Sequence, residues 1–323
     1  RNLFKGRALR VTAMRLDTGM RSSAVILILA MLISGCQGDR APGPVVPPVL
    51  TEPNDGNASY SDRHGECAYQ TLVTDVVTPD PSRFQARRHA GSQEEMNYRL
   101  FVPTDYDRNR SYPIVLLLHG GGSRGPDNES QLAGVGPYLF SGEQVQSQHP
   151  SFVLVPKVED VNGQWASDDD DRLSINLLTV LEILDALEEE FSIDAQRLYV
   201  LGGSLGGAGT WDLLTKRPER FAAFVPYAAP IRWAWLQRGR LPTVMPAAAA
   251  ALRGKSFWFL YGENDANFGL KPWWDELALY IRAAGGDPKF TEYVNGEHVI
   301  GTCVFTEPDL IRWLYSHRRD DEE

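Results

Sequence analysis

The sequence has few cysteines, an excess of acidic over basic residues, and no apolar segment long enough to cross a bilayer. Its 323 residues include 32 Lys and Arg against 42 Asp and Glu, which gives a net charge of −10. Nucleic-acid binding needs a basic face that displaces counterions, so we expect no nucleic-acid partner. The run of apolar residues at 24–33 is half of the ~20 residues that a membrane-spanning helix needs. Because 43% of the residues are hydrophobic, the chain can bury one sizeable core.

The N-terminal segment has the layout of an export signal. Arg21 precedes the apolar run 24–33, and small residues follow it up to Cys36. The ending Ile-Ser-Gly-Cys resembles the bacterial lipobox, which implies that Cys36 is acylated. We therefore expect residues 1–36 to be an upstream segment and lipoprotein signal peptide. The mature protein would be exported and lipid-anchored to the bacterial cell envelope, with membrane contact only through Cys36.

The next segment is rich in proline and has neither a helical nor a strand period. Residues 37–66 therefore predict a flexible tether, and residues 67–323 predict the folded domain. If Cys36 carries a lipid, Cys67 and Cys303 are the two cysteines left. Disulfides persist outside the cytoplasm, so these two either form a bridge or remain two free thiols, and the sequence leaves both alternatives open.

Strand-like and helix-like segments alternate along most of the domain. Segments 69–77 and 96–102 are partly alternating and predict an antiparallel start to a sheet. Later strands are apolar throughout, as expected when both faces are buried. They cover 113–118, 151–155, 197–201, 221–226, 256–261 and 289–294, and the main predicted helices cover 173–191, 272–285 and 307–317. The pattern predicts an α/β fold with a mostly parallel, doubly wound sheet and no large lid domain.

One strand runs directly into a glycine-rich turn that carries a serine. Residues 202–206 read Gly-Gly-Ser-Leu-Gly, between the strand 197–201 and a helix that ends before Pro218. A nucleophilic serine on a tight strand-to-helix turn needs neighbours without side chains two positions before and after it. Ser204 is therefore the candidate nucleophile, whereas an incidental serine in a glycine-rich turn is the alternative.

A second glycine-rich turn follows the strand 113–118. Acyl transfer places negative charge on a carbonyl oxygen, and two fixed N–H donors must stabilise it. Leu205 supplies one as the residue after the nucleophile, and Gly121 is the candidate for the other. A phosphate-binding loop is the competing interpretation, but neither Gly-Lys-Ser/Thr nor Gly-x-Gly-x-x-Gly follows here.

The acid and the base of such a site should follow Ser204 in the order Asp, then His. After the strand 256–261 comes Asp265, with Glu263 as a rival in the same loop. After the strand 289–294 comes His298, and the one later histidine, His317, lies near a charged tail. The order and the strand ends favour Asp265 and His298.

These motifs together resemble a known family. They are YPIVLLLHGGGSRGPDN (112–128), RLYVLGGSLGGAGTW (197–211), FLYGENDAN (259–267) and FTEYVNGEH (290–298). The segment 96–315 is similar to secreted bacterial α/β-hydrolases of the phospholipase/carboxylesterase, prolyl-oligopeptidase-like group, which includes feruloyl-esterase-like enzymes. The resemblance implies a Ser204–Asp265–His298 triad and an oxyanion turn at 119–121. It implies a carboxylesterase that needs no cofactor and no metal.

The substrate side of the site is less defined by the sequence. Trp165 and Trp233 flank strand ends and are candidates for lining a substrate pocket, with ordinary packing as the alternative. The acidic run 168–171 precedes a helix and is expected to cap it rather than to bind a metal. We expect a small-molecule or polymer-borne ester substrate, such as a feruloyl or acetyl ester of plant polysaccharide. A serine peptidase and a polyhydroxyalkanoate depolymerase are the alternatives.

Overall fold

The computed structural model describes most of the predicted domain. The described residues are 62–64, 67, 77–169, 171–229, 252–266, 271–283, 285–286 and 288–319. Cys36, most of the tether 37–66 and Trp233 lie outside them, so the lipobox, the tether and the role of Trp233 stay predictions. Within the described ranges, no helix combines the length and the apolar character needed to span a bilayer.

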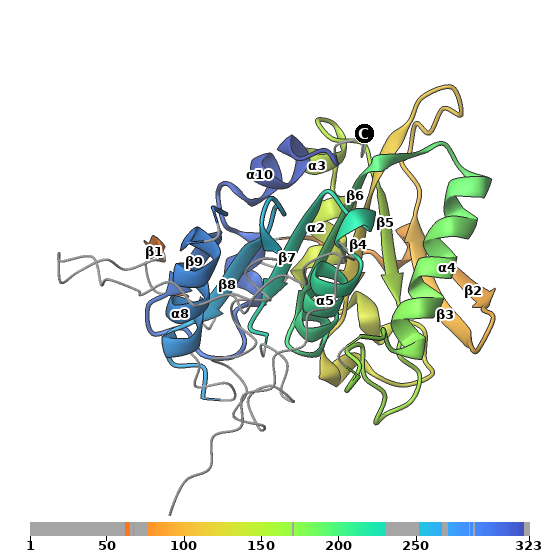
Figure 1. The fold of residues 1–323 in the computed structure, drawn as a ribbon. Coiled ribbons are helices and arrows are strands. Elements are labelled where there is room, and N and C mark those ends of the chain that lie inside the picture. The colour runs from red at the N-terminus through yellow and green to blue at the C-terminus, as the bar shows by residue number, and fades with distance from the viewer. Residues whose placement is uncertain are drawn as a thin grey trace, which may run out of the picture. The chain divides into compact units, whose positions relative to one another are not determined.

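A nine-stranded sheet forms the centre of the described structure (Figure 1). Its strand order is β1-β9-β8-β7-β6-β4-β5-β3-β2. The strands are β1 (Asp62–His64), β2 (Gln85–Ala90), β3 (Glu95–Phe101), β4 (Tyr112–Leu118), β5 (Phe152–Pro156), β6 (Ile193–Gly203), β7 (Ala223–Tyr227), β8 (Trp258–Gly262) and β9 (Lys289–Tyr293). Neighbouring strands from β1 across to β5 run parallel, and β3 pairs antiparallel with both β5 and β2. The predicted α/β fold class with a mostly parallel sheet is confirmed. The predicted strand 96–102 corresponds to β3, but its antiparallel partners are β2 and β5, and residues 69–76 of the other predicted strand lie outside the described residues.

Helices cover both faces of this sheet, because alternate side chains of the central strands point in opposite directions. Ile114 and Leu116 pack into one core, whereas Val115 and Leu117 pack into the other. The first core is covered by α4 (Ile175–Glu190), α5 (Leu205–Lys216) and α8 (Lys271–Ala283). The second is covered by α2 (Val135–Ser141), α3 (Glu143–Gln146), α9 (Gly301–Phe305) and α10 (Leu310–Ser316). Four short 3-10 helices, at Pro81–Arg83, Gly121–Ser123, Ser130–Leu132 and Pro218–Arg220, occur among the described residues.

Both edge strands differ from the sequence-based expectation. The strand β1 pairs with β9 although it lies inside the predicted tether, so the folded part begins before Cys67. The strand β2 was not predicted, because its side chains are mostly exposed and polar. An edge strand is held by backbone hydrogen bonds to one neighbour, and therefore it needs no apolar pattern.

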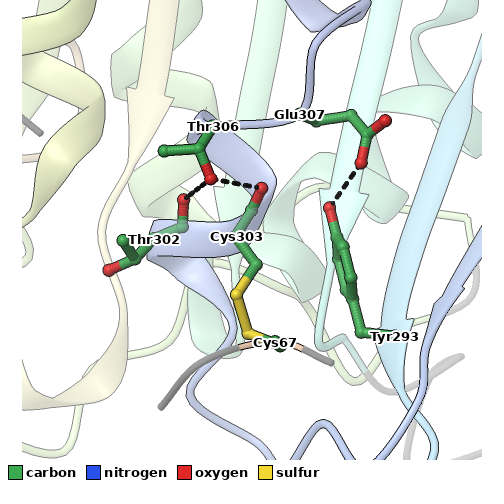
Figure 2. The surroundings of a disulfide bond; sticks show 6 residues. All are labelled: Cys67, Tyr293, Thr302, Cys303, Thr306 and Glu307. Atoms are coloured by element: carbon green, nitrogen blue, oxygen red, sulfur yellow. Dashed lines mark hydrogen bonds between the residues drawn. A yellow bond between two sulfur atoms is a disulfide. The ribbon is translucent and has the colours of Figure 1, made fainter. Parts of the chain in front are cut away.

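A disulfide joins the start of the folded part to a helix near its C-terminal end. Cys67 is bonded to Cys303 in α9, with 5.7 Å between the two Cα atoms (Figure 2). Beside it, the buried hydroxyl of Tyr293 donates to Glu307 at 3.0 Å. Burial and the neighbouring Glu307 carboxylate raise the pKa of Tyr293 above its usual range. Of the two alternatives left open by the sequence, the structure therefore contains the bridge.

We predict that the double variant Cys67→Ala/Cys303→Ala is less stable than the wild type by about 2–4 kcal/mol. The reason is that the bridge spans 236 residues and restricts the unfolded chain. Urea denaturation of both proteins under oxidising conditions measures the difference. As a control, thiol titration of the denatured, unreduced wild type should detect neither cysteine, and detection of both would contradict the bridge.

Candidate active site

The serine of the glycine-rich turn has an unusual backbone conformation. Ser204 lies between the end of β6 and the start of α5, with φ 54° and ψ −117°. A positive φ in a non-glycine residue is strained, and such strain collects at functional turns. The N–H of Ser204 donates to the carbonyl oxygen of Tyr227 at the end of β7, at 3.1 Å. The turn is thus anchored to the neighbouring strand, as a nucleophile turn at a strand end requires.

The glycines around Ser204 are required by close backbone contacts. A Cβ atom at Gly206 would lie 1.9 Å from the carbonyl oxygen of Leu118, at the end of β4. At Gly202 it would lie 2.3 Å from the carbonyl oxygen of Gly206. Since real Cβ atoms do not approach backbone this closely, these two positions accept only glycine without a shift of the turn. The N-terminus of α5 can therefore rest directly on the ends of β4 and β6.

The structure brings Ser204, His298 and Asp265 together from three strand ends. The Nε2 atom of His298 lies 2.8 Å from the Oγ of Ser204, and its Nδ1 lies 2.9 Å from Oδ2 of Asp265. With the proton on Nδ1, the ring donates to the carboxylate and accepts from the hydroxyl. The Asp265 side chain is 8% exposed and that of His298 is 23% exposed. Asp265 is therefore largely shielded from solvent, whereas His298 remains partly accessible to a substrate.

Contacts between the two loops distinguish Asp265 from its rival Glu263. The carboxylate of Glu263 accepts the N–H of Asn295 at 3.1 Å. The N–H of Asn264 donates to the carbonyl oxygen of Gly296 at 2.7 Å. These bonds join the loop after β8 to the loop after β9, and Asp265 is the residue left facing His298. Glu263 thus holds the loops together, whereas Asp265 contacts the imidazole.

The second glycine-rich turn lies against the serine turn. Gly121 begins a short 3-10 helix at the end of β4, and a Cβ at Gly120 would lie 3.8 Å from the carbonyl oxygen of Gly203. Leu205 is the first residue of α5, so its N–H has no acceptor within the helix. The two expected oxyanion donors are therefore on adjoining turns.

His119 holds this turn in place and is not a second base. Its Nε2 accepts the N–H of Val158 at 3.1 Å, so its Nδ1 carries the proton and donates to the carbonyl oxygen of Gly120 at 2.8 Å. Burial lowers the pKa of His119 to about 4. The ring is neutral near pH 7 and both of its nitrogens are engaged.

Trp165 does not line a pocket, which corrects the sequence-based expectation for this residue. Its side chain is fully buried, and its indole N–H donates to the carbonyl oxygen of His119 at 3.0 Å. It also packs on α5, since a Cβ at Gly209 would lie 2.5 Å from its own Cβ. Tryptophan combines a large apolar surface with one N–H that needs an acceptor when buried, and here both serve the oxyanion turn.

The acidic run before α4 does not cap that helix. Ser174 is the N-cap, and its hydroxyl accepts the N–H of Leu177 at 3.1 Å. The loop is held instead by Lys216 of α5, which donates to the carbonyl oxygen of Asp169 at 3.0 Å and to Asp212 at 2.7 Å. Throughout the described ranges, no cluster of three or more His, Cys, Asp or Glu residues could hold a metal ion.

A buried lysine, which was not predicted from the sequence, fixes the segment that follows the oxyanion turn. Lys157, just after β5, is fully buried and donates to the carbonyl oxygen of Ser123 at 2.6 Å and to Asp127 at 2.9 Å. The backbone N–H groups of Glu129 and Ser130, together with Lys157, hold the pKa of Asp127 well below its usual range. A charged residue directly after an apolar strand was the available signal.

Comparisons with known proteins show the family of this chain. A model of the family described as "Putative esterase" matches residues 90–295, which is well over half of the chain. The chain belongs to the putative-esterase family. A crystal structure of a thermostable esterase is similar to it at 29% identity and a TM-score of 0.63, over 74% of this chain and 64% of the other. The prediction of an α/β-hydrolase fold is thus confirmed, and the family is consistent with the predicted carboxylesterase-type activity.

Other relatives match this chain over shorter segments or at lower sequence identity. Dipeptidyl-peptidase 5 of Porphyromonas gingivalis is 28% identical over 39% of this chain and 18% of its own length. Probable feruloyl esterase C of Aspergillus niger is 24% identical over 39% of this chain and 43% of its own. The chain therefore spans less than half the length of these curated relatives. A feruloyl esterase module from Clostridium thermocellum shares the fold at 14% identity and a TM-score of 0.56, over 76% and 93% of the two chains.

We predict that Gly206→Ala destabilises this protein by about 1–3 kcal/mol, although alanine is the better helix former. The added methyl group meets the backbone of Leu118, and such overpacking outweighs the gain of ~1 kcal/mol in helix propensity. Thermal unfolding measures the change. Gly122→Ala is the matched control for stability, because a Cβ there meets nothing within 4 Å. Equal melting temperatures for wild type and Gly206→Ala would contradict the close approach.

Proposed function

We propose that this protein is a serine carboxylic-ester hydrolase that works through an acyl-enzyme on Ser204. The observation that carries the proposal is the position of His298, within hydrogen-bond distance of both Ser204 and Asp265. This is the arrangement in which a histidine activates a serine hydroxyl while a carboxylate orients the ring. The triad roles rest on this geometry and on the order of the three residues along the chain.

The reaction proceeds in two halves. The Ser204 oxygen attacks the ester carbonyl while Nε2 of His298 takes the hydroxyl proton. The N–H groups of Leu205 and Gly121 stabilise the negative oxygen, and removal of one such donor typically costs about a hundredfold or more in rate. His298 then returns the proton to the leaving alcohol. A water molecule, deprotonated by the same nitrogen, releases the acid and restores Ser204.

Asp265 has a supporting role in this proposal. Its carboxylate accepts the Nδ1 proton of His298, which keeps Nε2 free to accept from Ser204. It also stabilises the imidazolium that forms when the proton moves. His119 cannot act as the base in place of His298, because its two nitrogens are engaged by the backbone of Gly120 and Val158.

The substrate class follows from the relatives more than from the site. We propose esters borne by small molecules or by plant polysaccharide, including feruloyl and acetyl esters, because feruloyl esterases are among the relatives. A serine peptidase is the second candidate, since a dipeptidyl-peptidase is also among them. A polyhydroxyalkanoate depolymerase is the third. The same triad chemistry serves all three, and an assay must separate them.

A panel of purified substrates tests this function. We expect turnover of p-nitrophenyl acyl esters and of at least one of methyl ferulate, acetylated xylan and polyhydroxybutyrate, with no turnover of aminoacyl anilides. In Asp265→Asn, the histidine loses its anionic partner, and we expect kcat to fall by about a thousandfold or more.

Glu263→Gln is the matched control, because it makes the same carboxylate-to-amide change in the same loop. We expect it to retain most of kcat, since Glu263 contacts Asn295 and not His298. A larger loss in Glu263→Gln than in Asp265→Asn would reverse the assignment of the acid. Turnover of the anilides alone would establish the peptidase instead.

A further inference from the structure

A cavity adjoins the triad on the face of the sheet that α2 and α9 cover, and its volume is about 220 Å³. Gly120 of the oxyanion turn lines this cavity. So do Tyr227, whose carbonyl oxygen accepts the N–H of Ser204, and Val299, which follows His298 in the chain. A group attached to the reacting carbonyl can therefore extend into the cavity.

The wall of the cavity is mostly apolar. Leu117, Leu201 and Val135 line it and are buried. Val299 also lines it and is 66% exposed, so the cavity opens to solvent beside the catalytic histidine. An apolar cavity of about 150 Å³ accepts benzene. A volume of 220 Å³ therefore fits an apolar chain of roughly six to nine non-hydrogen atoms.

Phe305 of α9 separates the cavity from the core behind it. Its side chain lines the cavity and is 9% exposed. The ring meets that of Tyr227 edge to face, with 5.7 Å between the centroids, and that of Phe140 in the same manner at 6.3 Å. Phe140 is fully buried and lies outside the described lining of the cavity. A smaller side chain at position 305 would therefore extend the cavity toward Phe140.

A glycine of α2 accommodates the tip of the Phe305 ring. A Cβ atom at Gly136 would lie 2.6 Å from Cζ of Phe305, so the ring rests directly on the backbone of α2. Gly136 and Tyr227 also line the cavity, and they come from α2 and β7. Phe305 therefore closes the cavity between this helix and this strand.

The helix that carries Phe305 is held in place by covalent and hydrogen bonds. Cys303 lies between the two lining residues Thr302 and Phe305, and it is bonded to Cys67 (Figure 2). The N–H and the hydroxyl of Thr306 both donate to the carbonyl oxygen of Thr302, at 3.0 and 2.9 Å. A wall that is fixed in this way limits the size of the group that the cavity admits.

We propose that the cavity receives the acyl chain of the ester substrate and that Phe305 is the specificity-determining residue that limits the length of this chain. The acyl group stays on Ser204 through both halves of the reaction, so it can occupy a cavity that ends at Phe305. The alcohol, in contrast, must leave after the first half. Because the carbonyl carbon stays at Ser204, the volume corresponds to acyl chains of about seven to ten carbons. This inference rests on the proposed ester hydrolase activity and names the acyl group that the site prefers.

The test measures kcat/KM for two series of substrates. The p-nitrophenyl esters of straight-chain acids, from acetate to tetradecanoate, vary the acyl chain. The n-alkyl acetates, from methyl to dodecyl acetate, vary the alcohol. In the wild type we expect kcat/KM in the acyl series to rise about fourfold with each buried methylene. It should reach a maximum between heptanoate and decanoate and fall for longer chains.

Two variants change the cavity in opposite directions. Phe305→Leu enlarges it, and we expect the maximum to move to chains that are longer by roughly three carbons. Gly301→Ala narrows it, since a Cβ there fits at 3.8 Å from the ring of Tyr227, and both residues line the cavity. This variant creates no void, and we expect its maximum at chains that are shorter by about one carbon.

Phe152→Leu is the matched control, because Phe152 is a buried phenylalanine in the core on the other face of the sheet. The variant makes the same change of side chain, and its maximum should equal that of the wild type. A merely structural role for Phe305 would lower kcat/KM for all chain lengths in Phe305→Leu and leave the position of the maximum unchanged.

An unchanged maximum in both Phe305→Leu and Gly301→Ala would overturn the proposal while the ester hydrolase activity stands. A length dependence that occurs only among the alkyl acetates would overturn it as well, since the cavity would then bind the alcohol. Calorimetric titration of Ser204→Ala with octanoate and dodecanoate gives a readout without turnover. We expect octanoate to bind about tenfold more tightly, and this preference should be lost in Ser204→Ala/Phe305→Leu. Equal binding of the two acids by Ser204→Ala would contradict the proposed limit, whether or not any ester is hydrolysed.

Discussion

The geometry of the site depends on a close contact between backbone segments and not on a contact between side chains. The N-terminus of α5 rests on the ends of β4 and β6, at a distance that leaves no room for a Cβ at Gly206 or Gly202. This contact forces Ser204 into its strained conformation and places Leu205 next to the turn that carries Gly121. Without it, the serine and the two N–H donors would belong to separate strand ends. Close backbone packing is therefore the constraint from which the geometry of the site follows.

Polar groups then hold the turns that surround this contact. His119, Trp165 and Lys157 each bond to the backbone of the oxyanion turn or of its continuation. Glu263 does the same for the loop that carries Asp265. These side chains are mostly buried and bonded to fixed partners, so their hydrogen bonds stabilise the position of the backbone. The reacting groups are consequently few, and the residues that position them are many.

Most of the fold could be predicted because it follows from apolar periodicity. The buried parallel strands read as continuous apolar runs, and the strands β4 to β9 lie close to their predicted ranges. The edge strands β1 and β2 could not be found in this way, since backbone bonding at an edge leaves no apolar signature. The short helices α2, α3 and α9 were also missed, because fewer than two helical turns give too little periodicity to recognise.

The candidate site was predictable where chemistry constrains order and was not predictable where packing decides. Ser204, Asp265 and His298 could be identified because each follows a strand in a fixed sequence. Trp165 was assigned to a substrate pocket, but the same position at a strand end also suits a buried residue that fills space under the turn.

In the proposed mechanism, the Oγ atom of Ser204 attacks the ester carbonyl. The most direct measurement is covalent labelling with a fluorophosphonate, followed by peptide mass spectrometry of the wild type. We predict one adduct per chain, located on Ser204, with loss of ester hydrolysis in proportion to labelling. Ester hydrolysis that survives in fully labelled protein, or an adduct on a different residue that tracks the loss of activity, would contradict the account.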